Sequence, residues 1–97
     1  MTKVRLPVQL MEFAKIPAGK ILEFDATSLT EVFDQLELAF PQLRGTLRDP
    51  NTKTRRPYIR IFAQQIDLSD IDPSSRLSED LIEGIDDVHF VTAISGG

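Results

Sequence analysis

The feature that most constrains the fold is the motif Ser28-Leu29-Thr30-Glu31, because it fixes where a helix begins. The Ser28 hydroxyl can accept from the backbone N–H of Glu31, whose carboxylate can reach back in a capping box. Apolar residues then recur at helical spacing until Pro41, which ends or bends the helix. They are Leu29, Val32, Phe33, Leu36, Ala39 and Phe40. In a chain of 97 residues, this stripe is more simply the core face of the helix than a partner groove.

Alternating apolar residues ahead of the helix predict two strands. Residues 4–10 alternate with period two and read as the first strand. Its inward side chains are expected to be Val4, Leu6, Val8 and Leu10. Pro7 cannot donate a ladder hydrogen bond, so it must occupy a non-bonded position or a bulge. Residues 16–19 carry turn signals, and residues 20–25 are expected to return as the second strand of a hairpin.

Two further strands are predicted after the helix. Residues 58–64 place Ile59, Ile61 and Ala63 on one face and leave Arg60 and Phe62 on the other. Residues 88–94 form the last strand, and the segment 65–87 between them reads as irregular.

The order strand, strand, helix, strand, irregular segment, strand predicts an α+β fold of the β-grasp type, with a mixed sheet of four to five strands packed on one main helix. We expect residues 1–97 to form one domain, with the first and last strands as parallel neighbours at the sheet centre.

Several kinds of chemistry find no support in the sequence. There is no cysteine, and the single histidine, His89, is not surrounded by residues at metal-ligand spacing. Ser95 has no partner histidine nearby, and no glycine-rich phosphate loop is present. A net charge of −4 argues against general nucleic-acid binding. The N-terminus lacks a long apolar run, so we expect no signal peptide, no membrane span and a cytoplasmic protein.

Charge is distributed unevenly along the chain. Six of the eleven basic residues lie between Arg44 and Arg60, within and around a polar loop, residues 48–57. From Phe62 to Gly97 there are eight acidic residues and one basic residue. This acidic half is a candidate docking surface for a basic partner. The alternative is a solvated face that keeps the protein soluble.

The last four residues, Ile94-Ser95-Gly96-Gly97, are the strongest candidate site. Two glycines without Cβ atoms make a thin segment that can enter a narrow channel. The pKa of a terminal carboxyl lies well below neutrality, so the group is ionised. Such a carboxylate can attack an activated phosphate to give an acyl-adenylate, which a sulfur or nitrogen nucleophile then captures. The alternative is that Gly96 and Gly97 are simply a frayed end.

The segment Leu81 to Gly97 resembles the C-terminal motif of the MoaD/ThiS ubiquitin-like sulfur carriers. That family ends in leucine-x-x-glycine-aspartate-x-valine, an apolar strand and Gly-Gly. Residues 39–43 resemble its aromatic-proline-x-leucine helix end, and residues 44–63 resemble a branch with a longer loop. The sequence departs from the family pattern at Thr92, where many members have proline, and at an apparently inserted Ile85.

The resemblance implies a sulfur-carrier protein that serves as a cosubstrate rather than an enzyme, unless it is a subunit of a molybdopterin synthase. A ubiquitin-activating-enzyme-like adenylyltransferase would adenylate Gly97, with Gly96 giving clearance. A sulfur donor would then create a thiocarboxylate, and a sulfur-acceptor enzyme would receive the sulfur. The chain itself would bind no cofactor, because the activating enzyme uses the ATP. Candidate pathways lead to molybdopterin, thiamine, cysteine or siderophores.

A partner-facing surface is expected on the last two long strands beside the tail. Its candidate residues are Arg60, Phe62, His89, Val91, Ile94 and Ser95. Two other functions remain open at this stage. One is a ubiquitin-like modifier joined through Gly97 to a target lysine, and the other is a β-grasp interaction module with an inert tail.

Overall fold

The computed structural model describes residues 1–93. The candidate residues Ile94, Ser95, Gly96 and Gly97 lie outside this range. The strands are β1 (Thr2–Arg5), β2 (Leu22–Phe24), β3 (Ile59–Ala63), β4 (Ile66–Asp67) and β5 (Asp87–Thr92). The helices are α1 (Val8–Phe13), α2 (Leu29–Ala39), the 3-10 helix η1 (Pro41–Leu43) and α3 (Glu79–Ile82).

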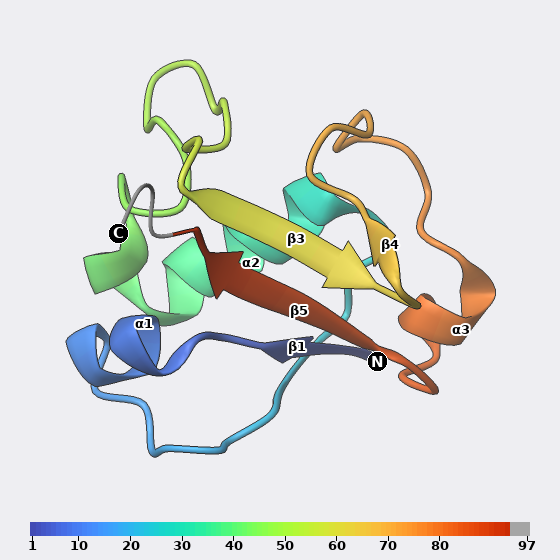
Figure 1. Ribbon diagram of the computed structural model, residues 1–97, viewed down its shortest axis with the longest axis horizontal. Coiled ribbons are helices and arrows are strands. Elements are labelled where there is room, and N and C mark those ends of the chain that lie inside the picture. Colours follow the sequence, from blue (N-terminus) through green and yellow to red (C-terminus); the bar gives the residue numbers. More distant parts are fainter. Residues whose placement is uncertain (94–97) are drawn as a thin grey trace.

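The five strands form one mixed sheet in the order β2-β1-β5-β3-β4. Val4 of β1 pairs with Val88 of β5 in the parallel direction, and the other pairings are antiparallel (Figure 1). The sequence-based prediction that the first and last strands are parallel neighbours at the sheet centre is confirmed. β5 therefore lies between β1, which pairs with residues 87–89, and β3, which pairs with residues 89–92.

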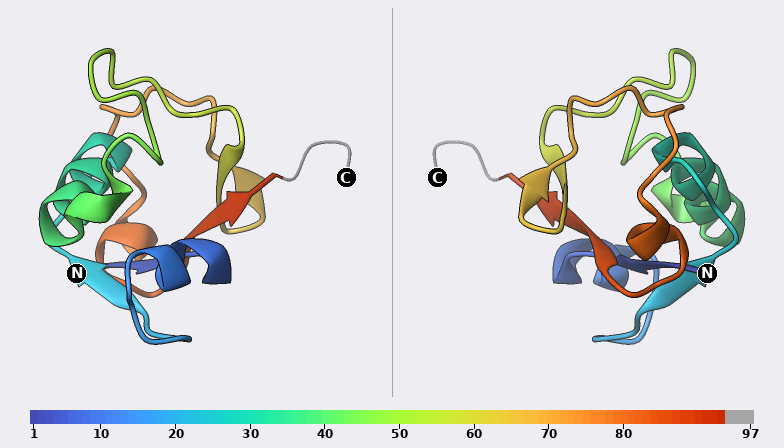
Figure 2. Two further views of the ribbon diagram at one scale, coloured as in Figure 1. Left: turned by 90° about the vertical axis from the view of Figure 1, so that its left-hand side faces the viewer. Right: turned by 90° about the vertical axis from the view of Figure 1, so that its right-hand side faces the viewer.

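Helix α2 packs against one face of this sheet and leaves the other face of β3 and β5 uncovered by a helix (Figure 2). The Ser28 hydroxyl accepts from the Glu31 N–H at 3.2 Å, as predicted. The Glu31 carboxylate reaches back to the N–H and hydroxyl of Thr27. The predicted core stripe is buried except at its end, where Ala39 is exposed and Phe40 is half-buried. The buried members are Leu29, Val32, Phe33 and Leu36.

The prediction of one strand over residues 4–10 is wrong beyond Arg5. The chain turns at Pro7 and enters α1, so Val8 is 53% exposed instead of pointing inward. Pro7 has φ −66° and ψ 153° at the N-cap, where its missing N–H removes no helical hydrogen bond. Leu6 and Leu10 are buried, but only Leu10 lies in α1, and Leu6 precedes the N-cap Pro7. The predicted pairing of β1 with β2 is correct, although α1 intervenes between the two strands in the sequence.

The segment 65–87, predicted to be irregular, contains β4 and α3. β4 returns antiparallel to β3 through a two-residue turn at Gln64 and Gln65, where φ is 54° and 64°. Both positive φ values are the geometry of a tight hairpin turn that normally favours asparagine and glycine. No helix among residues 1–93 is long and apolar enough to cross a membrane.

The inner faces of β3 and β5 supply the centre of the core. Ile59, Ile61 and Ala63 are buried as predicted, and so is Phe90. Phe90 meets Phe33 of α2 edge to face, with ring centroids 5.5 Å apart. Because side chains alternate along a strand, this register turns Arg60 and Phe62 of β3 and Asp87, His89 and Val91 of β5 to the outer face.

Candidate functional site

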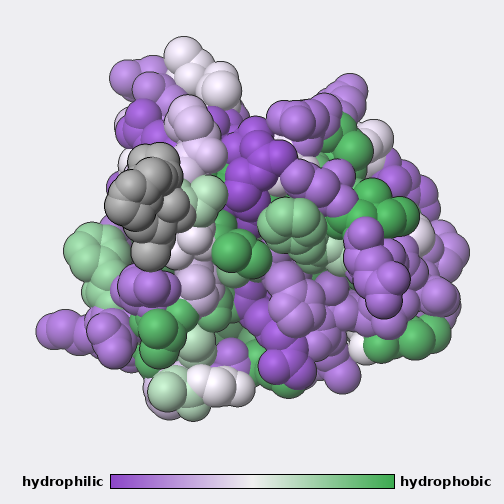
Figure 3. Space-filling view, viewed as in Figure 1, coloured by the Kyte–Doolittle hydropathy of each residue, from purple (hydrophilic) through white to green (hydrophobic). Residues whose placement is uncertain are grey.

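The outer face of β3 and β5 brings together four of the predicted partner-facing residues. Phe62 lies opposite His89 in the register, and Arg60 lies opposite Val91. Phe62 is 37% exposed and Val91 is 41% exposed, while His89 is also exposed. Figure 3 views this face and shows small hydrophobic areas surrounded by hydrophilic surface. An apolar centre with a polar rim is the usual anatomy of a protein interface.

Two ion pairs lie beside this apolar centre. Arg60 donates to Asp67 of β4 at 2.5 Å. Arg5 of β1 donates to Asp87 at 2.5 Å. Charged hydrogen bonds restrict the side chains that form them, so the two ion pairs give the outer face a defined shape. As exposed pairs, they contribute little to the free energy of folding.

Asp67 is the carboxylate of this face whose ionisation is most strongly favoured. Hydrogen bonds from Ser69, together with the one from Arg60, lower the pKa of Asp67 to about 2. Ser69 in turn accepts the Ile61 N–H at 2.8 Å, which ties the carboxylate to the sheet.

We predict that Asp67→Asn will reduce the loss of stability in acid. A carboxyl whose folded pKa is lowered contributes stability above its unfolded pKa, near 4, and that contribution is lost as the pH falls toward 2. The free-energy difference between wild type and Asp67→Asn, measured by urea unfolding, should therefore be largest at pH 5–7 and shrink between about pH 4 and 2. A difference that stays constant across this range would contradict the assignment.

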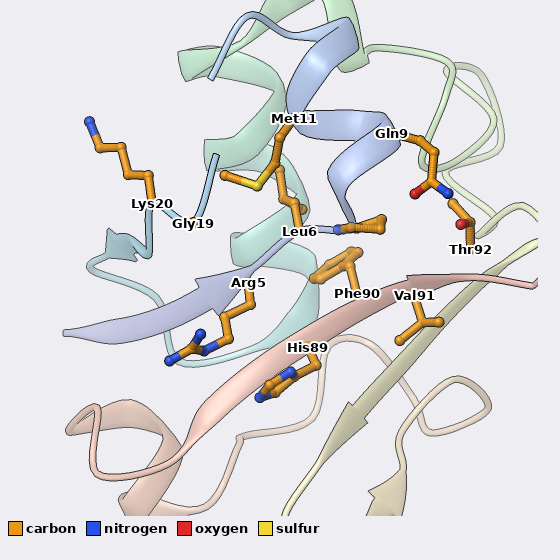
Figure 4. Close-up of a pocket in the computed structure, with 11 residues that line it drawn as sticks. Arg5, Leu6, Gln9, Met11, Gly19, Lys20, His89, Phe90, Val91 and Thr92 are labelled. Carbon is orange, nitrogen blue, oxygen red and sulfur yellow. The ribbon is translucent and has the colours of Figure 1, made fainter. Parts of the chain in front are cut away.

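A shallow groove runs along β5 beside α1. It is bounded by Arg5, Gln9 and Lys20 on one side and by His89 and Thr92 on the other, with a volume of about 510 Å³. In Figure 4, Gln9 of α1 lies beside Thr92, and Arg5 lies beside His89. The groove adjoins the end of β5, so a partner that covers the outer face can also contact its basic rim.

The acidic residues of the second half do not form one continuous surface. Helix α3, with Glu79 and Asp80, lies near the start of β5, and β5 then runs away from it (Figure 1). The 48–57 loop instead lies near the C-terminal end of β5. The predicted acidic docking surface is therefore divided, since Glu79 and Asp80 lie near the start of β5 whereas Asp70 pairs with Arg55 of the 48–57 loop.

The last described residues are held firmly to β3. Thr92 pairs with Ile59, and the Ala93 N–H donates to the Tyr58 carbonyl at 2.7 Å. The Tyr58 hydroxyl donates to the Thr46 carbonyl at 2.8 Å, which anchors this edge. Within residues 1–93, no group of three or more His, Cys, Asp or Glu side chains is arranged to hold a metal ion.

Asp67, Arg5 and Gln9 also lie beside this face and were not among the predicted partner-facing residues. Asp67 lies in the segment read as irregular, and Gln9 lies in the stretch read as a strand. Arg5 alternates outward next to His89 in the parallel register. Its place could have been deduced from the predicted pairing of the first and last strands.

Comparison with solved structures gives matches over the whole chain. SAMP1 from Haloferax volcanii has a TM-score of 0.68 and 16% identity, covering 99% of this chain and 98% of that one. A chain of the BexX/CysO complex from Amycolatopsis orientalis has a TM-score of 0.75 and 15% sequence identity, with 100% of both chains covered. The small archaeal modifier protein 1 from Methanosarcina acetivorans has a TM-score of 0.72 and 20% sequence identity, covering 99% of this chain and 95% of that one. No protein-family model matches the sequence, and no curated protein matches it significantly.

The chain therefore has the ubiquitin-like β-grasp fold, as the sequence predicts. The similar structures, SAMP1 and CysO, are small ubiquitin-like proteins of the sulfur-carrier and modifier class. At the level of the fold, the resemblance to the MoaD/ThiS proteins is confirmed.

Proposed function

We propose that this protein is a sulfur carrier whose reacting group is the carboxylate of Gly97. The observation that carries the proposal is the position of β5, which lies at the sheet centre, carries the exposed Val91 beside Phe62 of β3, and ends at Thr92, four residues before Gly96 in the sequence. The similarity to CysO in its complex with BexX supports a carrier that works by docking onto another protein.

In the proposed reaction, the Gly97 carboxylate attacks the α-phosphorus of ATP on an adenylyltransferase and releases pyrophosphate. Sulfide then attacks the acyl carbon, AMP leaves with the bonding electrons, and a thiocarboxylate remains. The chain acts as a cosubstrate, and the partner enzyme supplies the ATP site. Because the adenylation step consumes ATP, we propose the cytoplasm as the location. The candidate pathways that would receive the sulfur are the syntheses of molybdopterin, thiamine and cysteine.

The proposal is tested by incubating the purified chain with an adenylyltransferase of its own organism, ATP and sulfide. Intact-mass spectrometry should show the exchange of one oxygen for one sulfur, and fragmentation should locate the change at Gly97. An unchanged mass in the presence of an enzyme that adenylates the chain would refute sulfur transfer.

We predict that Phe62→Ala and Val91→Asp each weaken docking to the adenylyltransferase about tenfold or more, because buried apolar anchors carry most interface energy. The measurement is the KM for the chain in ATP–pyrophosphate exchange. Leu38→Ala is the control, since Leu38 is 83% exposed on α2, away from the sheet face. Equal KM values for all three variants would exclude the outer face as the docking surface.

The comparisons also favour a second function, since two of the similar structures are small archaeal modifier proteins. In that role the adenylated Gly97 would form an isopeptide bond with a lysine of a target protein. Immunoblots of cells that express the tagged chain distinguish the two functions. Adducts of higher mass that resist reduction indicate a modifier, whereas a thiocarboxylate on the free chain indicates a carrier.

A further inference from the structure

A cavity on the helix side of the sheet is separate from the surfaces described above. It lies between the first turns of α2, residues 52–55 of the loop, β3 and the segment 69–73, with a volume of about 700 Å³. It shares no lining residue with the groove beside α1. Figure 3 shows the surface hollowed at the top, between two loops that can be identified in Figure 1. The volume is within the range of small-molecule sites.

The floor of the cavity is apolar and belongs to the core. Leu29 and Phe33 of α2 and Ile61 of β3 line it, and each is at most 4% exposed. Ile71, which is 37% exposed, and Pro73 continue the apolar surface toward the opening. Because the three floor side chains are already covered by the protein, Ile71 and Pro73 offer a ligand more accessible apolar surface than the floor does.

Two arginines stiffen the walls. Arg48 is 3% exposed, forms ion pairs with Asp34 at 2.5 Å and Glu37 at 3.0 Å, and lies 5.2 Å from the centre of the Phe33 ring. Arg55 donates to the backbone carbonyls of three residues and to the Asp70 carboxylate. These contacts connect the loop to α2 and to the segment 69–73, so the cavity is formed in advance of any ligand.

The Lys53 ammonium and the hydroxyls of Thr30 and Thr54 belong to the lining and have no partner among residues 1–93; Lys53 and Thr54 are exposed to solvent, and Thr30 is half-buried. No carboxylate of this part of the chain lies within 4.0 Å of the Lys53 ammonium, although Arg48 and Arg55 both have acidic partners. The hydroxyls of Thr30 and Thr54 also form no hydrogen bond within it. Lys53 has φ 64°, a conformation that non-glycine residues adopt rarely. One ammonium and two hydroxyls are suited to an anionic group.

We infer that this cavity binds a small organic anion with an apolar body. The apolar body packs on Ile71 and Pro73 at the opening of the cavity, and the anionic group accepts hydrogen bonds from Lys53 with Thr30 and Thr54. The inference goes beyond the proposed sulfur transfer and makes no use of Gly97. Its test therefore succeeds or fails independently of that function.

The test uses 2-naphthoate as the probe, titrated into the full 15N-labelled chain and followed by NMR. Saturable shifts are expected at residues around the cavity, with a dissociation constant on the order of 1 mM for a ligand this small. The neutral 2-naphthamide should bind about fivefold more weakly, because it loses the charge-assisted contact. Lys53→Gln should weaken naphthoate binding about fivefold.

Lys15→Gln is the matched control, since Lys15 is an exposed lysine with φ 60° outside this cavity. It should leave naphthoate binding unchanged. The inference is overturned by an absence of saturable shifts, by shifts confined to the outer face, or by equal binding of naphthoate and naphthamide. Binding of an acidic peptide at the cavity without naphthoate binding would overturn it as well, and would indicate a protein-docking site.

Discussion

Deleting Gly97 is expected to abolish ATP-dependent sulfur incorporation completely while leaving the domain folded. The buried core is built from residues between Val4 and Phe90, so the deletion removes none of its packing. The free energy of unfolding, measured with urea, should change by less than about 0.5 kcal/mol. Intact-mass spectrometry after incubation with the adenylyltransferase, ATP and sulfide measures the loss of sulfur transfer.

A chain extended by one alanine after Gly97 tests whether Gly97 itself or the terminal carboxylate that it carries is required. This variant keeps both glycines but moves the terminal carboxylate beyond them, and it should also be inactive. Leu38→Ala should react normally, because Leu38 lies on the exposed side of α2. Sulfur incorporation by either the shortened or the extended chain would place the chemistry elsewhere in the molecule.

The parts of the fold that the sequence predicts well are those where local chemistry and burial agree. The Ser28 cap, the apolar stripe of α2 and the inward residues of β3 all follow from periodicity, and the structure confirms them. The parallel pairing of β1 with β5 could be predicted because a β-grasp arrangement leaves the centre of the sheet to these two strands. Consistency between local pattern and global fold makes such elements predictable.

The misread elements are those in which a local pattern has two physical solutions. Leu6, Val8 and Leu10 fit a strand by alternation, whereas Leu6, Leu10 and Ala14 fit a helical face, and Pro7 decides in favour of α1. The β3–β4 hairpin lacks the usual asparagine-glycine turn, so Gln64 and Gln65 gave no signal. Helix α3 has only four residues, too few to show a period.

The candidate site divides in the same way. The outward positions of Arg60, Phe62, His89 and Val91 follow from strand alternation alone, and their roles in docking remain predictions. The ion pair between Arg60 and Asp67 could not be predicted, because Asp67 lies in β4, a strand that the sequence did not indicate. The cavity beside Lys53 brings together four segments, and no periodicity within a single segment indicates such an arrangement.

Gly84→Ala is expected to destabilise the protein by about 3 kcal/mol. Gly84 follows the C-cap of α3 with φ 78°, a left-handed conformation that costs alanine about 1 kcal/mol. A Cβ at this position would also lie 2.5 Å from the Met1 carbonyl oxygen, where no real contact is that short. Relieving this overlap means shifting the start of β1, which the buried hydrogen bond from Thr2 to the Ala26 carbonyl holds at 2.7 Å.

Gly19→Ala separates the two contributions to this cost. Gly19 has nearly the same φ, 79°, and nothing lies within 4 Å of the position its Cβ would take. Its substitution should therefore cost only the backbone term, about 1 kcal/mol. Urea unfolding of both variants measures the difference, which reports how tightly the turn before β5 is packed against the first strand. Equal losses for the two variants would show that β1 moves aside freely, so that the start of β5 is less firmly fixed than its central place in the sheet implies.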